Sequence, residues 1–568
     1  MSSGARTFGL HETFAEPEAL PPPPVRHALL LFLVALAAIL HIGTAGWSEI
    51  HNGAEGLYAA SARQMLAAET SLLPRSAGAE LPNEPPLLHW LLLASFKLFG
   101  VTALAARLPI ALGFVAAVAL TFLIGERLAD YWRGFVAGLI FLCSCGAYLW
   151  GRFVTPEPLF AAWIAAAVWC AIGGYQDRRS RRRWFAGFWC CVAGAYVTRG
   201  AFAVLVLAVI IGLPAVCFRE ARLRFAALFH WPGLMACLLG VSIWLLILRR
   251  AAPGSLLDGA WLHPLVPTEA RWQIDGVPLL EFLAPHLFWW FPAILVVVPG
   301  IIFAWRKIIR PQEFDFAEAV PLCWVACGVL LFVFVDRHEY DFVAASSGFA
   351  LFAATAWQRT SHKLRLTGLA LVAVGSIAAA FAIRFGALVL PGLGAAAFDR
   401  SDVHLLIFAG VALAVCCAAA MYLTIHGRET LAIAAVLVAL VPIGLGIAER
   451  IARNGPHLSF GRVADFLQTA PFHTGEVLFE GSRAAGSSLN FYLARGFSHV
   501  ADVSSSANPT GNRLTSAQAL ERMGQPEPAY LIIHKERVPW WQAQLTERFH
   551  IYHQVTTCGS YVVVNNHP

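Results

Sequence analysis

Acidic and basic residues gather in the short polar segments between long apolar runs, and these segments could do chemistry. The first of them carries Glu55, Tyr58 and Arg63 on a stretch with helical spacing of its apolar residues. A carboxylate can accept a proton from a hydroxyl, and an arginine can hold a phosphate with two parallel hydrogen bonds. Glu55 also has a simpler interpretation, because an acid at a helix N-terminus compensates the helix dipole.

Two more acids stand just before apolar stretches. Glu84 precedes Pro85 and Pro86, where proline and an acid both favour the start of a helix. Glu157 lies at the mouth of an apolar run, where a carboxylate is costly unless it faces water, a partner or a cavity. An ion pair between Glu157 and Arg152 is the structural alternative to a catalytic role.

Further candidate site residues stand in three other polar segments. Arg199 separates two apolar runs, and His263 lies in the polar loop near 249–283. The turn 336–341 combines both charge signs, so it could bind an anion or simply be solvated. Its candidate residues are Arg337, His338 and Tyr340.

Common catalytic motifs do not account for these residues. The chain contains no HExxH, GxSxG or phosphate-loop pattern, and no apolar run repeats the acids of a proton-coupled transporter. The residue types alone therefore indicate a cluster of acids and arginines between apolar runs, without naming a reaction.

Membrane-spanning helices are the elements that must position this cluster. Hydrophobic residues make up 58% of the 568 residues and charged residues only 13%, against about 25% in soluble domains. The net charge of +6 comes from Lys and Arg clusters between the apolar runs, so it does not suggest nucleic acid. We predict about thirteen spans. They lie near 28–46, 103–125, 134–150, 158–175, 184–198, 201–217, 231–248, 284–304, 319–335, 342–357, 364–384, 403–424 and 430–447.

The basic clusters assign the two sides of the membrane. They fall on one face only if the segment 87–99, which is too short to span comfortably, lies along the membrane as a juxtamembrane helix. We therefore predict a cytoplasmic tail at 1–27 and a transmembrane domain at 28–447. The outer face, opposite the cytoplasm, then receives the loop 47–102, the turn at Glu157 and the C-terminus.

Residues 448–568 have the composition of a small soluble α/β domain. Helical patterns are predicted at 463–468, 516–523 and 540–548, and strands at 476–479, 529–534, 549–555 and 561–565. The segment shows no phosphate loop and no metal-ligand spacing. Packing, or guiding of an acceptor, is therefore favoured over a second active site.

The order of several motifs resembles a known family. Residues 55–66 read EGLYAASARQML, residues 84–90 read EPPLLHW and residues 105–109 read AARLP, followed by TPEP at 155–158 and TRG at 198–200. This order resembles the bacterial aminoarabinose transferase and protein O-mannosyltransferase group, glycosyltransferase family 39, which has the GT-C fold. The resemblance covers roughly residues 28–360.

The resemblance implies roles for individual residues. Glu55, with Glu157 as second candidate, would be the catalytic base, and Arg63, Arg199 and Arg337 would hold the donor phosphate. The family's Asp-Glu pair is Ala54-Glu55 here, and its Glu-Lys-Pro-Pro motif has lost the lysine. A metal site carried over to Asn83 and His263 would have an asparagine amide in place of a carboxylate, so no metal or other cofactor is assigned.

The predicted function is that of an all-α polytopic membrane glycosyltransferase with a small C-terminal α/β domain. As the resemblance implies, it would transfer a sugar from a polyprenyl-phosphate donor to an envelope lipid or protein at the outer face of the bacterial inner membrane. The alternative is a non-catalytic binder or carrier of a lipid-linked saccharide, which Ala54 and the missing lysine favour.

Overall fold

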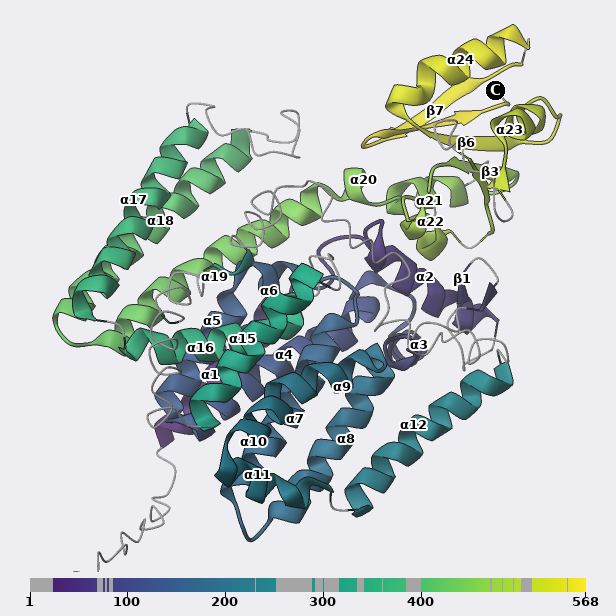
Figure 1. Ribbon diagram of the computed structural model, residues 1–568. Coiled ribbons are helices and arrows are strands. Elements are labelled where there is room, and N and C mark those ends of the chain that lie inside the picture. The colour runs from purple at the N-terminus through teal and green to yellow at the C-terminus, as the bar shows by residue number, and fades with distance from the viewer. Residues whose placement is uncertain are drawn as a thin grey trace, which may run out of the picture.

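The computed structural model is largely helical (Figure 1). It describes residues 24–68, 75–76, 79–80, 85–229, 231–251, 289–291, 300, 316–334, 342–359, 361–384, 400–469, 472–482, 484–493, 495–501, 513–548 and 550–567. The predicted site residues that lie outside these ranges are Glu84, His263, Arg337, His338 and Tyr340.

Twelve of the thirteen predicted apolar runs form helices, and the thirteenth, 284–304, lies almost wholly outside the described residues. Two runs are interrupted, one at Ser144 between α5 and α6 and one by the π-helical turn η1. The helices are α1 (Pro24–His41), α4 (Ala103–Leu128), α5 (Tyr131–Cys143), α6 (Cys145–Trp150), α7 (Glu157–Gln176), α8 (Arg181–Arg199), α9 (Phe202–Leu207), η1 (Ala208–Gly212), α10 (Leu213–Cys217), α11 (Arg219–Phe225), η2 (Ala226–Phe229), α12 (Trp231–Ala251), α15 (Phe316–Phe334), α16 (Phe342–Arg359), α17 (His362–Arg384), α18 (Arg400–Ile425) and α19 (Glu429–Arg453).

The lengths and apolar composition of these helices make the chain a multi-pass membrane protein. Among the described residues, five helices are long and apolar enough to cross a bilayer, within α4, α7, α12, α18 and α19. A bent pair, 202–217 with 219–229, brings the number to as many as six. Several shorter apolar helices, such as α1, α5 and α16, accompany them. The multi-pass prediction is confirmed, while the number thirteen stays a prediction.

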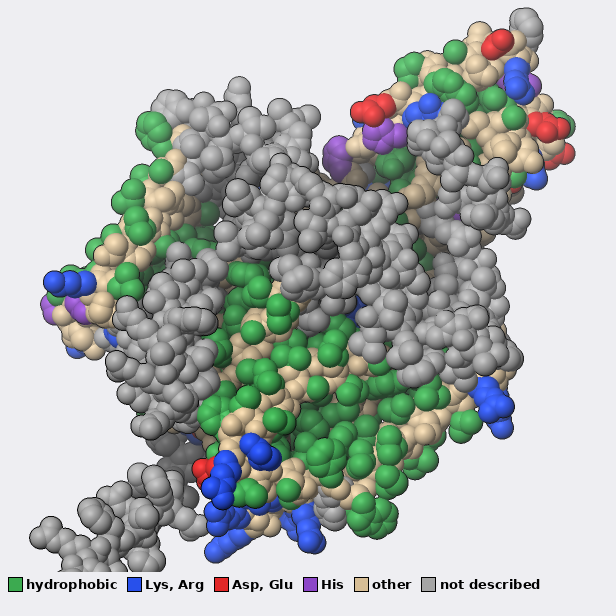
Figure 2. All heavy atoms as spheres, in the orientation of Figure 1, with side chains coloured by type: hydrophobic (Ala, Val, Ile, Leu, Met, Phe, Trp, Pro, Cys, Tyr) green, Lys and Arg blue, Asp and Glu red, His purple; other side chains and the backbone are tan. Residues whose placement is uncertain are grey.

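Basic side chains gather at one end of the helical bundle. Arg178 and Arg179 are exposed in the turn between α7 and α8. Arg224 of α11 donates to the carbonyl of Tyr175 in α7 at 3.1 Å, so α11 lies at the same end. Figure 2 shows Lys and Arg side chains gathered beneath the apolar surface of the bundle. Glu157 and the C-terminus of α8 lie at the other ends of these two helices.

The first predicted outer loop contains the helices α2 (Ala54–Ala67) and α3 (Leu87–Phe99) and a short hairpin, β1 (Arg75–Ser76) with β2 (Ala79–Glu80). Helix α3 has 13 residues, a length of about 20 Å, which is less than the roughly 30 Å of a hydrocarbon core. This length agrees with a juxtamembrane helix. The sequence pattern predicts Leu57 on the apolar face of α2 and Glu55 on its polar face, but Glu55 is buried and Leu57 is exposed.

A mixed six-stranded sheet follows α19 (Figure 1). Across the sheet the strands are β5 (Arg513–Leu514), β4 (Ser498–Val500), β3 (Glu476–Glu480), β6 (Ala529–His534), β8 (Tyr561–Asn565) and β7 (His553–Cys558). The first four are parallel, and β8 runs antiparallel to both of its neighbours. The helical segments of this part are α20 (Gly455–Leu458), α21 (Gly461–Gln468), α22 (Ser487–Tyr492), α23 (Ser516–Met523), η7 (Lys535–Arg537) and α24 (Val538–Glu547).

Most of this small domain agrees with the predicted pattern. Helices α21, α23 and α24 and strands β3, β6 and β8 lie where the sequence predicts them. The strand predicted at 549–555 was placed too early, since β7 begins at His553 and ends at Cys558. The sequence pattern missed α22, β4 and β5, which have six, three and two residues.

Helix α22 joins the small domain to the first loop by polar contacts. The amide of Gly53 donates to Ser487 Oγ at 2.9 Å, and Ser488 Oγ donates to Asn52 Oδ1 at 2.6 Å. Ser487 Oγ in turn donates to the carbonyl of Gly53 at 3.1 Å. These reciprocal bonds fix the entry into α2, where Gly53 has a positive φ of 89°.

Aromatic residues at the end of α22 extend this contact. The hydroxyl of Tyr492 accepts a hydrogen bond from the amide of Ile50 at 2.7 Å. Phe491 is buried in the apolar core that α2, α3 and α4 share. The small domain therefore packs against the first loop and helps to hold it in place.

Gly56 allows α2 to approach α22 closely, and an added methyl should push them apart. A Cβ at Gly56 would lie 2.8 Å from the backbone nitrogen of Ser488. We expect Gly56→Ala to lower the free energy of unfolding by about 1–3 kcal/mol through overpacking, measured by thermal unfolding in detergent. Gly368→Ala is the control, because a Cβ there meets nothing within 4 Å. Equal stability of the two variants would contradict this packing.

Candidate active site

Glu55 and Arg107 form a buried ion pair at the base of the first loop. Glu55 stands in the first turn of α2, and Arg107 comes from α4. Arg107 Nε donates to Glu55 Oε1 at 2.8 Å, and Nη2 donates to Oε2 at 2.9 Å. The backbone amides of His51 and Val154 donate to the same two oxygens, at 2.9 and 3.2 Å. A carboxylate offers about four acceptor sites, so the hydrogen-bonding capacity of Glu55 is filled.

The N–H donors of the Arg107 guanidinium are all used as well. Its Nη1 donates to the carbonyls of Ala45 and Ser48 at 2.8 and 2.7 Å, and its Nη2 donates to the carbonyl of Glu49 at 2.7 Å. With the two bonds to Glu55, all five N–H groups of the guanidinium have acceptors. The pair thereby ties α4 to the segment 45–49 and to α2.

The filled carboxylate of Glu55 favours positioning over proton transfer. Burial alone would raise the pKa of Glu55, but the charge and hydrogen bonds of Arg107 hold that pKa below its ordinary value. A low pKa makes a weak base near neutral pH. Its oxygens also have no acceptor site left for a substrate hydroxyl, so this geometry favours a positioning role for Glu55 over the predicted role of catalytic base.

Glu157 differs from Glu55 because its oxygens are open. It is the first residue of α7 and only 1% exposed, and Arg199 Nε at the end of α8 lies 3.1 Å from its Oε1. Neither oxygen makes a hydrogen bond to a described residue, and the same holds for the buried hydroxyl of Thr155. Buried polar groups are almost always hydrogen-bonded, so this turn has acceptor capacity for a substrate.

The two acids are linked through one turn. Val154, whose amide binds Glu55, lies in the same turn as Glu157. The ion pair of Glu55 and Arg107 therefore fixes the segment that presents Glu157.

Arg63 and Tyr58, two further predicted site residues, face other parts of the protein. Arg63 Nη1 donates to the backbone carbonyls of Phe491 and Leu493, the latter at 3.1 Å, so it joins α2 to the small domain. The ring of Tyr58 lies 5.6 Å from the ring of His89, between α2 and α3.

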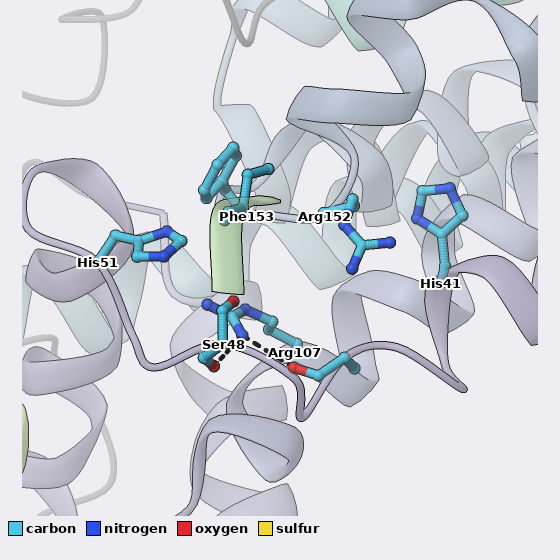
Figure 3. Close-up of a pocket in the computed structure, with 8 residues that line it drawn as sticks. His41, Ser48, His51, Arg107, Arg152 and Phe153 are labelled. Carbon is cyan, nitrogen blue, oxygen red and sulfur yellow. Dashed lines mark hydrogen bonds between the residues drawn. The ribbon is translucent and has the colours of Figure 1, made fainter. Parts of the chain in front are cut away.

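A small pocket lies beside the ion pair, and Figure 3 shows Arg152 in it between two histidines. Arg152 does not pair with Glu157, the structural alternative considered from the sequence. Its Nη1 and Nη2 donate to the carbonyls of Leu40 and Thr44 at 2.8 and 3.3 Å. The lining residues are His41, Ala45, Ser48, His51, Arg107, Arg152, Phe153 and Ile451.

A metal site does not emerge from the part of the chain that the structure describes. Within it, no three or more His, Cys, Asp or Glu side chains come together in a way that could hold a metal ion. Asn83 and His263 lie outside it. No reaction step is assigned to a metal here.

The fold of the chain is similar to those of two solved structures. It matches the crystal structure of ArnT from Cupriavidus metallidurans bound to undecaprenyl phosphate with a TM-score of 0.75 and 17% identity, over 95% of this chain and 98% of that one. A more distant match, at a TM-score of 0.51 and 13% identity, is the Archaeoglobus fulgidus oligosaccharyltransferase in its apo form, over 94% of this chain and 74% of that one.

Sequence comparisons give the particular relatives. Residues 83–247 match the family described as dolichyl-phosphate-mannose-protein mannosyltransferase. An undecaprenyl phosphate-alpha-4-amino-4-deoxy-L-arabinose arabinosyl transferase of Proteus mirabilis is 24% identical over 49% of this chain and 50% of its own length. A protein of that description from Sodalis glossinidius is 26% identical over 55% of each chain. The chain spans about half the length of these curated relatives. The predicted resemblance to the aminoarabinose transferase and protein O-mannosyltransferase group is confirmed.

Arg107 is the central site residue that the sequence did not single out. It was part of the AARLP motif, but no role was given to it. The available signal was an arginine inside an apolar run, because such a charge is costly unless it is paired. No sequence pattern predicts the contacts between α22 and the entry into α2, because they join residues more than four hundred positions apart.

Removing Arg107 should unfold the first loop. Arg107→Met leaves the buried carboxylate of Glu55 unpaired, and we expect the free energy of unfolding to fall by about 3–5 kcal/mol. Thermal unfolding of the purified protein measures this loss. The double variant Glu55→Gln/Arg107→Met should recover part of it, because no unpaired charge remains. A double variant less stable than Arg107→Met would contradict the pairing.

His51 should contribute to acid sensitivity. Burial lowers its pKa to about 4, against the attraction of Glu55, while an unfolded histidine has a pKa of about 6.5. The unfolded state therefore binds more protons between these values, and stability is lost as pH falls from about 6.5 to 4. We expect His51→Gln to flatten this decline in unfolding temperature. His457→Gln, at an exposed site, is the control and should leave the decline unchanged; a His51→Gln profile that matches the wild type would refute the assignment.

Proposed function

We propose that this chain is a membrane glycosyltransferase that moves a sugar from a polyprenyl-phosphate donor to an envelope lipid or protein acceptor. The single observation that carries the proposal is the fold match along 95% of the chain to the ArnT structure bound to undecaprenyl phosphate. Relatives named as arabinosyl transferases acting from undecaprenyl phosphate support a pentose as the sugar, and the match to a mannosyltransferase family leaves a hexose open.

Glu157 is the base in this proposal, and Arg199 binds the leaving phosphate. Glu157 takes the proton of the acceptor hydroxyl, the acceptor oxygen bonds to the anomeric carbon, and the bond from that carbon to the phosphate oxygen breaks. Polyprenyl phosphate leaves with the electron pair. A guanidinium has five N–H donors, so Arg199 can contact both Glu157 and a phosphate oxygen, stabilising the negative charge that develops.

The other predicted residues take supporting places. Glu55 and Arg63 position α2. The carboxylate of Glu55 accepts hydrogen bonds from Arg107, and Arg63 donates hydrogen bonds to backbone carbonyls of the small domain. Arg337 remains a predicted phosphate ligand. Glu84, His263, His338 and Tyr340 remain predicted members of the site, outside the described residues.

The proposed topology has about thirteen spans within residues 28–447 of a bacterial inner membrane, with the N-terminal tail in the cytoplasm. The turn at Glu157 and the domain 448–568 lie in the periplasm. The separation of Glu157 from the exposed arginines at the opposite end of α7 and α8 supports this orientation.

A non-catalytic binder of a lipid-linked saccharide is the second candidate. One observation favours it, since Ala54 stands at the position where the family's aspartate is suspected to catalyse. Such a protein would bind polyprenyl-phosphate sugars without transferring them.

Glu157→Gln separates the two candidates. We expect it to lower the rate of transfer from a labelled polyprenyl-phosphate sugar by about 10²–10⁴-fold, the usual contribution of a general base. Donor binding, measured by copurification of the labelled lipid, should be retained. Accumulation of transferred label in an envelope extract gives the rate.

Glu126→Gln is the matched control, because Glu126 pairs with Arg26 at the basic end of the bundle. It should transfer at the wild-type rate. Wild-type transfer by Glu157→Gln would overturn its role as base. Donor binding without transfer by the wild-type protein, tested with lipid and protein acceptors, would favour the non-catalytic candidate.

A further inference from the structure

The pocket beside the Glu55–Arg107 pair contains a positive charge without an acidic partner. Arg152 is largely withdrawn from solvent, and burial lowers its pKa. Among the described residues it forms no ion pair, and its partners are the carbonyls of Leu40 and Thr44 and the hydroxyl of Tyr148. These bonds use three of the five N–H groups of a guanidinium. A cation removed from water and left unpaired is costly.

Neither of the nearby acids, Glu55 and Glu49, forms an ion pair with Arg152. The carboxylate of Glu55 is filled by Arg107 and two backbone amides. The carboxylate of Glu49 points toward Gly461 of the small domain, and its Oε2 makes no hydrogen bond to a described residue. Neither acid lines the pocket, whose charged lining residues are Arg107, paired with Glu55, and Arg152, which has no acidic partner among the described residues.

Two histidines with buried rings line this pocket. His41 and His51 are only 3% and 5% exposed, and neither ring makes a hydrogen bond to a described residue. The ring of His41 is stacked on Phe114 at 3.8 Å, which fixes its plane. Figure 3 shows both rings flanking the guanidinium of Arg152, above Ser48. A neutral imidazole still carries one N–H donor.

We infer that this pocket is a binding site for a small monatomic anion such as chloride. The anion would accept hydrogen bonds from the free N–H groups of Arg152 and from the imidazoles of His41 and His51, and it would offset the unpaired charge. The pocket has a volume of about 10 Å³, close to what one water molecule needs. A halide is not much larger than a water molecule, whereas phosphate and sulfate are much larger ions.

Occupancy would affect the candidate active site through shared residues. His51 Nδ1 lies 3.3 Å from Glu55 Oε2, and Arg152 shares a turn with Val154 and Glu157. An anion in the pocket would therefore stabilise the segment that holds Glu157. Binding itself is independent of sugar transfer, so it can be measured whether or not the proposed function holds.

Equilibrium binding of chloride-36 to the purified protein tests this site. The protein is exchanged into sodium gluconate at constant ionic strength, and bound label is measured by scintillation proximity. We expect saturable binding that bromide displaces and phosphate or sulfate does not. Arg152→Gln should abolish it. His41→Phe keeps the stacked ring but removes the donor, and should weaken binding by about tenfold or more, the value of a hydrogen bond to a charged group.

Arg178→Gln is the matched control, since it removes one positive charge at the exposed opposite end of the bundle and should bind like the wild type. Absence of saturable binding to the wild type would overturn the proposal, as would equal losses in Arg178→Gln and Arg152→Gln. Equal displacement by phosphate would overturn the assignment to a monatomic anion. Wild-type binding by His41→Phe, shown to be folded by its unfolding temperature, would exclude the imidazole from the site.

Discussion

The ion pair between Glu55 and Arg107 is the interaction on which the candidate site depends. Two buried charges lose much solvation free energy, and their attraction compensates only when the remaining hydrogen bonds are also made. Here every N–H of the guanidinium and every acceptor site of the carboxylate is used. The pair joins the segment 45–49, α2, α4 and the turn before α7, so four separate parts of the chain meet at one charge pair.

This arrangement divides the work between the two buried acids. The carboxylate of Glu55 uses all its acceptor sites in hydrogen bonds that fix the surrounding segments. The carboxylate of Glu157 lies beside Arg199, and its oxygens accept no hydrogen bond from a described residue. A reactive group works best when its surroundings are rigid before the substrate arrives. The small domain adds to this rigidity, because α22 clamps the entry into α2 and Arg63 binds the backbone that follows α22.

The sequence predicts elements well where one physical signal dominates. Hydropathy located the helices of the bundle, and strong periodicity located α23 and β6 to the residue. Short elements such as β5, with two residues, lack a period to detect. The contacts of Glu55 and Arg63 cannot be predicted from the sequence for another reason. Their partners are 52 and 428 or more positions away, and whether an acid is filled or open depends on the fold that brings such partners together.

The contacts of Glu55 bear on the alanine at position 54. The family resemblance implies an aspartate at the start of α2 as the catalytic acid, and this chain keeps only the following glutamate. Glu55 could replace that aspartate only by breaking four hydrogen bonds and leaving Arg107 unpaired. Breaking a buried ion pair in this way strongly destabilises the folded state. If the chain transfers sugar, the base must therefore come from another element. Among the described residues, the turn that ends in Glu157 offers a buried carboxylate with open oxygens, and Glu55 is what keeps that turn in place.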